Sequence, residues 1–254
     1  MTWKAQANAV LRICYLQGIL GLIRSPIFFV AIFLTPLSFL FFLYVVAPHS
    51  VLPFGVVGGI LFSVLFTGNG TMTDSAYLRL ERQLQQVFIT SPIRPMAWVL
   101  GIALGELAFT VPALALFIIV LGFVVHISAL TVLALIGVIL LTWLLSSSLG
   151  FLLSTFFRQL REIWPIGMVV FTALSVLPPV FYPIAEIPAS FRWVAYLSPS
   201  TFASQLAANA AGLPVPVLTV VPALSSVPVE VAGLVLLTLL FTVMAMRLAR
   251  FREP

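Results

Sequence analysis

The sequence predicts an all-α polytopic membrane protein that forms a single transmembrane domain over residues 1–254. The chain is 62% apolar and only 7% charged, whereas soluble domains are about half apolar. Several apolar runs reach the roughly 20 residues that a helix needs to cross about 30 Å of hydrocarbon. Uncharged runs of this length exclude a transmembrane β-barrel, because its strands are about ten residues long and alternate in polarity.

The basic residues are distributed in a way that predicts the orientation of the chain. All of the twelve lysines and arginines except Arg192 fall in segments that should share one side of the membrane. Lysine and arginine favour cytoplasmic loops, so we expect both termini and the loop that begins at Asp74 to be cytoplasmic, in a multi-pass protein of the cell membrane. The net charge of +5 follows this topology and does not indicate a nucleic-acid partner.

Residues 1–25 are predicted to form an N-terminal helix that lies in the inner membrane interface. Apolar side chains from Trp3 to Cys14 share one helical face, while Lys4 and Arg12 lie on the other. An interfacial tryptophan and the basic residues would anchor this helix among the lipid headgroups. Cys14 is the single cysteine, which excludes an internal disulfide.

Six transmembrane helices are expected after this segment. Their approximate ranges are 27–46, 53–73, 97–124, 130–157, 163–182 and 231–246. The second range is rich in glycine, and the third contains Gly101-x-x-x-Gly105; both patterns favour close helix packing. Pro178-Pro179 should break the fifth helix near the outer surface.

Residues 183–229 are too apolar for a solvated loop and too long for a turn. Prolines that include Pro183, Pro188 and Pro199 cut this segment into pieces too short to cross the membrane. We therefore expect extracellular re-entrant helices before the last span, because backbone at membrane depth must satisfy its own hydrogen bonds. Glu186 and Arg192 are a candidate ion pair in this segment.

Residues 74–96 are the longest polar interruption between apolar runs. At helical spacing, apolar side chains such as Leu84 and Phe88 share one face, and Arg79 and Arg82 lie on the other. Two interpretations remain open. The segment is either an amphipathic cytoplasmic helix on which a soluble partner pushes, or a solvated loop whose apolar face lies in the lipid headgroups.

Glu106 is the carboxylate that the sequence places within a membrane helix. Such a residue is a functional candidate by default. Because its apolar run is longer than one crossing, an ion pair with an arginine near the inner interface is favoured over a proton or substrate role.

The sequence lacks the residues that several kinds of catalysis and binding require. Lys4 is the only lysine, so a G-x-x-x-x-G-K-[ST] phosphate loop cannot be present, and the chain is not itself a P-loop ATPase. His49 and His126 have no cysteine or carboxylate at ligand spacing, so neither a metal nor a cofactor is expected. We find no Ser/His/Asp set in the sequence that would indicate a hydrolase. If the protein moves a substrate across the membrane, the energy for it would therefore come from outside the chain.

Two stretches carry a resemblance to a known family. Glu81-Arg82, Thr90-Ser91-Pro92-Ile93 and Leu100-Gly101 resemble its coupling segment, and Phe181-Tyr182-Pro183-Ile184, Ile187-Pro188 and Leu197-Ser198-Pro199 resemble its motif before the last span. Over essentially the whole length, the chain is similar to the permease subunit of type-two ABC exporters, the ABC-2-type transporter permease family. One departure is that Gln83-Leu84-Gln85-Gln86 stands where the family commonly has Gly-Thr-Leu-Glu.

The resemblance implies ATP-driven export of a hydrophobic or amphipathic substrate: a drug, a natural product or a lipid. It implies a second copy of the permease or a paralogue, and separate ABC ATPase subunits that bind ATP and Mg²⁺. The expected ATPase contacts are Arg79, Glu81, Arg82, Leu84, Gln85 and Phe88, with a second set at Arg158, Arg161 and Glu162.

The transport route would lie between the two permeases, lined mainly by the first, second and fifth spans. The aromatic residues nearby (Phe28, Phe29, Phe33 and Phe62) are expected to pack or to face lipid rather than bind substrate. A polysaccharide or glycolipid exporter, a Glu106-dependent secondary transporter and a non-transporting scaffold are the alternatives.

Overall fold

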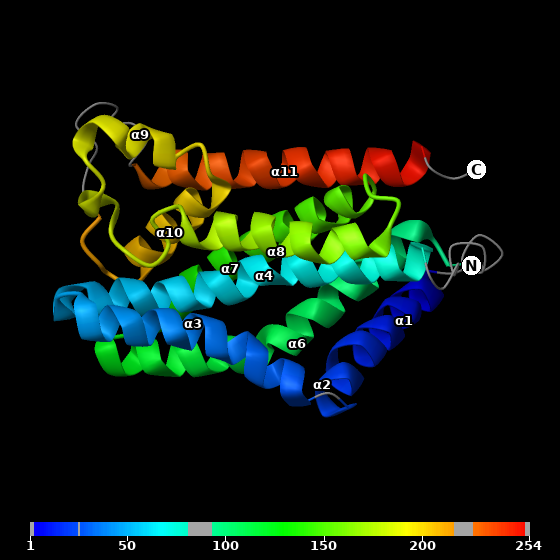
Figure 1. The fold of residues 1–254 in the computed structure, drawn as a ribbon, viewed down its shortest axis with the longest axis horizontal. Helices are drawn as coiled ribbons and strands as arrows, with labels where there is room; N and C mark the ends of the chain where they lie inside the picture. The colour runs from blue at the N-terminus through cyan, green and yellow to red at the C-terminus, as the bar shows by residue number, and fades with distance from the viewer. Residues whose placement is uncertain (1–2, 25, 81–92, 216–225, 252–254) are drawn as a thin grey trace.

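The computed structural model describes residues 3–24, 26–80, 93–215 and 226–251, and the parts of the chain that it describes contain helices but no strands. Six long helices form a bundle in which both chain termini lie at the same end (Figure 1). These helices are α3 (Pro26–Val46), α4 (Leu52–Leu80), α6 (Pro95–Val124), α7 (Ala129–Ser154), α8 (Leu160–Val176) and α11 (Val227–Phe251). The predicted all-α class is confirmed.

The six long helices fall where the sequence predicts six spans, but they are not equally suited to cross a membrane. Five segments of the described chain are long and apolar enough: Trp3–Arg24, His49–Leu80, Met96–Val124, Ala129–Ser154 and Val227–Arg247. α3 and α8 are not among them: the apolar stretch found in α3 is the shorter Phe33–Val46, and α8 ends at Val176, ahead of the two prolines. The chain is therefore a multi-pass membrane protein, and the count of six spans stays a prediction.

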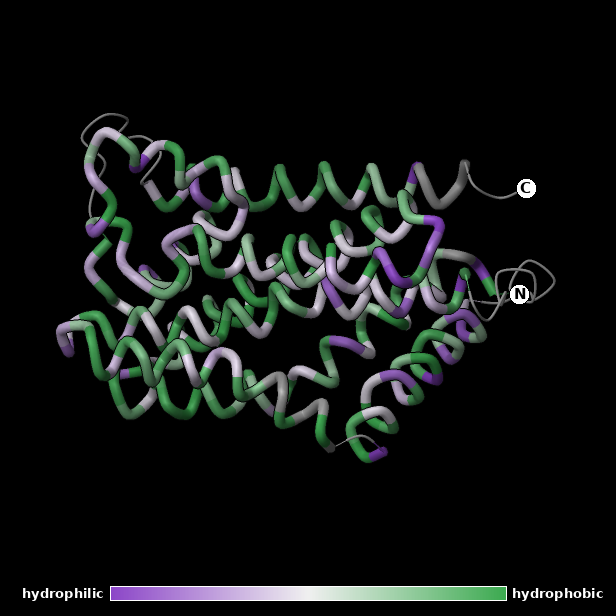
Figure 2. Tube along the Cα trace, in the orientation of Figure 1, coloured by the Kyte–Doolittle hydropathy of each residue, from purple (hydrophilic) through white to green (hydrophobic). Residues whose placement is uncertain are grey.

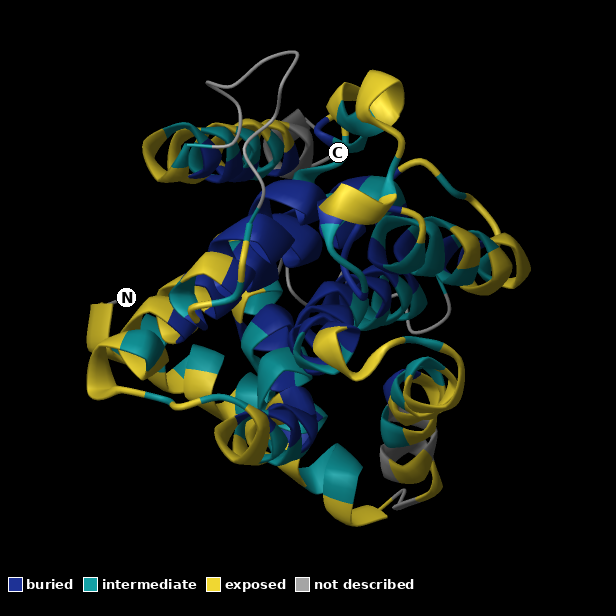
Figure 3. Ribbon diagram, turned by 90° about the vertical axis from the view of Figure 1, so that its left-hand side faces the viewer, coloured by how far each residue is buried: buried dark blue, intermediate teal, exposed yellow. Residues whose placement is uncertain are grey.

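α4 lies at the centre of the bundle and packs against α3, α6, α7 and α8. In this helix 83% of the apolar stretch is buried inside the chain, compared with 39% or less in the other candidate spans, and buried residues gather along the middle of the bundle (Figure 3). Its glycines make this packing possible. A Cβ added to Gly59 would lie 2.5 Å from the Phe117 ring of α6, and a Cβ on Gly150 of α7 would overlap the Gly68 carbonyl oxygen.

The N-terminal segment packs along α6. It consists of α1 (Trp3–Cys14), a π-helical turn (Tyr15–Ile19) and α2 (Leu20–Arg24). α1 is inclined to the long helices, and hydrophilic residues alternate with apolar ones along it (Figures 1 and 2). The predicted Gly101-x-x-x-Gly105 contact is confirmed: a Cβ on Gly101 would lie 2.8 Å from Ile13, and a Cβ on Gly105 would lie 2.8 Å from Gln17. The partner of this pattern is thus the N-terminal segment.

Short helical pieces lie at the end of the bundle opposite the termini (Figure 1). They are two 3-10 turns (Ile184–Glu186 and Ala189–Phe191), α9 (Arg192–Ala195) and α10 (Pro199–Ala210). The Arg192 side chain donates hydrogen bonds of 2.8 Å to the carbonyls of Ala185 and Ile187. These two bonds use two of the five guanidinium donors, and the expected ion pair with Glu186 stays a prediction. The depth of these pieces in the membrane stays a prediction.

Candidate functional site

The candidate site lies at the end of the bundle that carries both termini, where α4 and α7 end and α6 begins (Figure 1). Arg79 is in the last turn of α4. Its guanidinium donates to three carbonyl oxygens, those of Ser154, Thr155 (3.4 Å) and Phe157 (2.8 Å). The last carbonyls of a helix have no partner within that helix. Arg79 supplies one at the C-terminus of α7, where a positive charge also complements the helix dipole.

Arg79 thus joins two elements instead of projecting into solvent. Helical spacing places it on the polar face of the segment, and the family resemblance implies an ATPase contact. The structure places its side chain, partly buried, on the end of α7. The turn between α7 and α8 follows directly, and Arg158, Arg161 and Glu162 of that region are exposed. The carbonyl that Arg79 binds at Phe157 is adjacent to the first of them.

The other predicted coupling residues cannot be located in the same way. Glu81, Arg82, Leu84, Gln85 and Phe88 lie outside the described residues. The described chain reaches Leu80 at the end of α4 and resumes at Ile93, two residues before α6. Both ends of the predicted coupling segment are therefore at the end of the bundle that holds Arg79.

A second polar group lies deeper between α4, α6 and the N-terminal segment. Gly70 and Asp74 are one turn apart on α4 and share a face. The Asp74 carboxyl lies beside the Glu106 carboxyl of α6, and it accepts a hydrogen bond from Nε2 of Gln17. A Cβ on Gly70 would overlap the Glu106 carboxyl, so glycine is what leaves room for this side chain.

This arrangement corrects the arginine partner expected for Glu106. Its neighbour is a second carboxyl group, Asp74, which the sequence groups with the cytoplasmic segment. Two ionised carboxylates at close range repel each other, and neither could donate a hydrogen bond to the other. α4 continues as a helix to Leu80, so Asp74 lies on a packed face of the bundle. The sequence signal that could have found this pair is the i, i+4 spacing of Gly70 and Asp74.

The predicted outer motif is spread over three short elements. Pro183 and Pro188 each directly precede a 3-10 turn, and Pro199 is the first residue of α10. Glu230, in the first turn of α11, is fully buried beside Tyr196. The sequence analysis did not single out this residue. Burial and the neighbouring Glu230 carboxylate raise the pKa of the Tyr196 phenol above its usual range.

Among the described residues, no group of three or more His, Cys, Asp and Glu side chains is placed so that it could hold a metal ion. The candidate site is instead a set of contacts that connects helix ends. These contacts are electrostatic and hold helices together. The Arg79 guanidinium links α4 to α7, and the carboxyls of Asp74 and Glu106 with the Gln17 amide link α4 to α6 and the N-terminal segment.

A comparison with protein-family models gives a match described as ABC-2 type transporter over residues 9–211. This range includes the N-terminal segment from residue 9 onward, α3 to α8 and the outer pieces up to α10. The chain belongs to the ABC-2 type transporter family. Comparison with curated proteins finds none that matches it.

As a member of this family, the chain is the permease component of an ABC transporter. Arg79 and the Asp74–Glu106 pair both belong to the matched range. The permease therefore carries its candidate site at the end of the bundle where α4 ends and α6 begins.

Proposed function

We propose that the permease is the membrane subunit of an ATP-driven exporter that moves a hydrophobic or amphipathic substrate out of the cytoplasm. It would work with a second copy of itself or a paralogue, in a cell membrane with both termini cytoplasmic. Separate ABC ATPase subunits would bind ATP and Mg²⁺ and act on the predicted coupling segment within residues 74–96.

The observation that carries this proposal is the Arg79 contact. The predicted coupling segment begins within the last turns of α4, and Arg79 ties the last turn of α4 to the last carbonyls of α7. Force applied to the segment would reach both helices, and α4 is the most buried of the candidate spans. The exposed residues Arg158, Arg161 and Glu162 follow the same carbonyls and offer a second ATPase contact.

The apolar surface of α3 supports a hydrophobic or amphipathic substrate. Ile27, Val30, Leu34 and Phe41 of this helix are exposed in the single chain, so a route at the seam between two permeases would have apolar walls. Phe62 does not contribute to such a surface. It is buried and stacks on Phe66 with ring centroids 5.6 Å apart, as the sequence analysis expected.

One observation favours a second candidate function. The Asp74–Glu106 contact places two ionisable groups between helices of the bundle, and such groups occur in ion-coupled transporters. A secondary transporter that depends on Glu106 would use this pair to bind a proton.

Reconstitution in liposomes distinguishes the two functions. Liposomes that contain the permease, with or without its ATPase subunit, are supplied with a fluorescent hydrophobic cation. Its transport is driven either by ATP or by a proton gradient. We expect transport only with ATP and the ATPase subunit. Glu81→Ala combined with Arg82→Ala should lower ATP-driven transport at least about tenfold, equivalent to roughly 1.4 kcal/mol of coupling. Arg247→Gln, at the same end of the bundle, is the matched control and should leave transport unchanged.

Transport on a proton gradient without ATP, abolished by Glu106→Gln, would establish the second function and overturn the first. Unchanged ATP-driven transport in the Glu81/Arg82 variant would remove the coupling role of that segment.

A further inference from the structure

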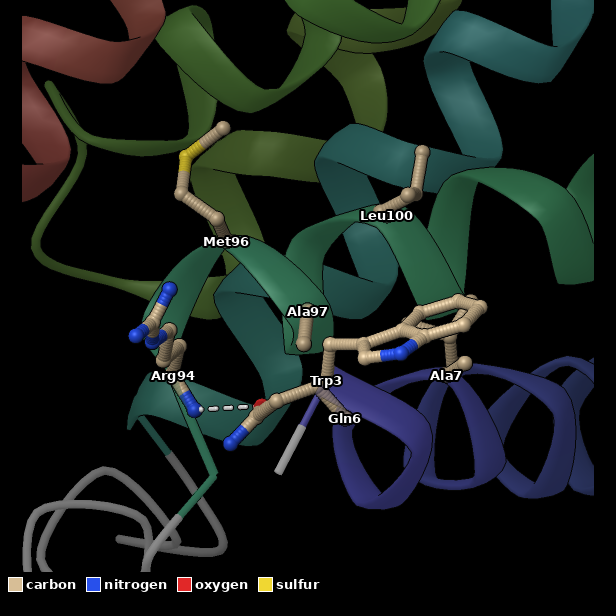
Figure 4. Close-up of a pocket in the computed structure, with 8 residues that line it drawn as sticks. Trp3, Gln6, Ala7, Arg94, Met96, Ala97 and Leu100 are labelled. Atoms are coloured by element: carbon tan, nitrogen blue, oxygen red, sulfur yellow. Dashed lines mark hydrogen bonds between the residues drawn. The ribbon is translucent and has the colours of Figure 1, made fainter. Parts of the chain in front are cut away.

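A groove of about 400 Å³ lies between α1 and the start of α6, at the end of the bundle that carries the termini (Figure 4). Its walls are apolar: Trp3, Ala7 and Val10 come from α1, and Ala97 and Leu100 come from α6. The volume is within the range of small-molecule sites in proteins. The groove shares none of its residues with the Arg79 contact or the Asp74–Glu106 pair.

The groove combines this apolar wall with one cation. Arg94 lies at its edge and is exposed. Its backbone N–H donates a 3.0 Å hydrogen bond to Oε1 of Gln6 on α1, drawn as a dashed line in Figure 4. This bond joins the two walls and fixes where the Arg94 side chain begins. No side chain caps the N-terminus of α6 at this point, so the positive end of the helix dipole adds to the charge of the guanidinium.

The charged side chains that the structure describes on α1 and in the first turn of α6 are all basic. Lys4 and Arg12 are exposed on α1, and the first 73 residues of the sequence contain no aspartate or glutamate. The first turn of α6 also contains no acidic residue. An anion is therefore the ligand whose charge complements this edge of the molecule.

The apolar wall continues outward from the cation along the bundle surface. The Trp3 side chain is 77% exposed, and Leu100 is 43% exposed. The Trp3 indole extends over Ala7, beside the α6 turn that carries Ala97 and Leu100 (Figure 4). Tryptophan prefers the headgroup level of a membrane, and arginine binds phosphate through paired N–H donors.

We propose that this groove binds one anionic glycerophospholipid from the leaflet on the side of the two termini. Its phosphate lies against Arg94 and the N-terminus of α6, and the upper part of one acyl chain lies against Trp3, Val10 and Leu100. The bound lipid would hold α1 against α6. The inference does not depend on export, because it rests on the groove and on membrane embedding alone.

The test uses the purified full-length permease in nanodiscs of neutral phosphatidylcholine, to which phosphatidylglycerol with chains brominated near the headgroup is added. Bromine quenches nearby tryptophan, and the difference between the wild type and Trp3→Phe isolates the Trp3 signal. We expect Trp3 to be quenched by brominated phosphatidylglycerol at a lower mole fraction than by brominated phosphatidylcholine. In Arg94→Gln, about fivefold more anionic lipid should be needed, since one basic residue near an anionic surface contributes about 1 kcal/mol.

Arg158→Gln is the matched control, because it removes an exposed cation at the same end of the bundle but outside the groove; it should behave as the wild type. Arg94→Lys keeps a charge and should recover part of the preference, which shows that loss in Arg94→Gln is not misfolding. Equal effects of Arg94→Gln and Arg158→Gln would overturn the proposal and indicate diffuse surface charge. Full competition by millimolar inorganic phosphate would overturn it as well, since the site would then take a free anion instead of a lipid.

Discussion

At the residue scale, Arg79 shows what a sequence pattern can and cannot assign. Helical spacing places it on the polar face of an amphipathic segment, and that part of the prediction does not depend on its neighbours. Its partners are the carbonyls of Ser154, Thr155 and Phe157, more than 70 positions away. Backbone carbonyls have no residue signature, so no reading of side chains could have found this contact.

Replacing Arg79 should destabilise the permease. Arg79→Ala leaves carbonyls at the end of α7 without a donor, and a buried polar group that loses its partner costs about 1–3 kcal/mol. A loss of about 2 kcal/mol corresponds to a fall in apparent Tm of roughly 4–8 °C for a chain of this size. Thermal unfolding of the purified protein in detergent, followed by tryptophan fluorescence, measures it. Arg158→Ala removes an exposed arginine nearby and should leave Tm within about 1 °C; equal shifts in both variants would contradict the role of Arg79.

The carboxyl residues show the same limit. Glu106 was found because it interrupts an apolar run, but the Asp74 that contacts it was assigned to the polar loop. Glu230 was missed because it stands at the very start of its apolar run, where an exposed flank is the usual expectation. Its burial against Tyr196 depends on how α9 and α10 fold back over α11, which is tertiary information.

At the element scale, the sequence predicts the helices well and their ends less well. Apolar length and proline positions determine where spans lie, and α6 and α7 match their predicted starts within two residues. α4 runs past the predicted end of its span to Leu80, because its polar last turns keep helical spacing and find partners such as the α7 carbonyls. α8 ends earlier than predicted, since two prolines follow Val176.

The close crossing of α4 and α7 should be sensitive to a single methyl group. In Gly150→Ala the added Cβ would overlap the Gly68 carbonyl oxygen, which is backbone and cannot rotate away, so the helices must separate at a cost of about 1–3 kcal/mol. Gly137→Ala in the same helix is the matched control, because nothing lies within 4 Å of its Cβ. It should be neutral or stabilising by up to about 1 kcal/mol. The apparent Tm of both variants checks this, and a Gly150→Ala protein as stable as Gly137→Ala would mean that α4 and α7 do not cross here.

At the scale of the whole molecule, the structure divides the chain between two ends. The termini and the α7–α8 turn lie at one end, and the short pieces from Ile184 to Ala210 lie at the other (Figure 1). The positive-inside pattern predicts which end is cytoplasmic, whereas the bundle determines which segments share an end.

Labelling of single cysteines in intact cells tests this division. In a Cys14→Ser background, Ser190→Cys should react with a membrane-impermeant maleimide. Arg158→Cys should react only after the membrane is permeabilised. Both positions are exposed in the structure, so a difference in reaction reports the side of the membrane. Labelling of both positions from outside would contradict the proposed orientation.

The continuity of α4 has a consequence for how the outer end could open. Its 29 residues correspond to about 44 Å at 1.5 Å per residue, and no proline interrupts the helix after Pro53. Side chains and backbone of neighbouring helices fill the space beside its glycines, so these glycines do not provide a hinge. A displacement of α4 at Arg79 would therefore tilt the whole helix and move its other end at Leu52. An opening motion would rotate α4 as a rigid body instead of bending it.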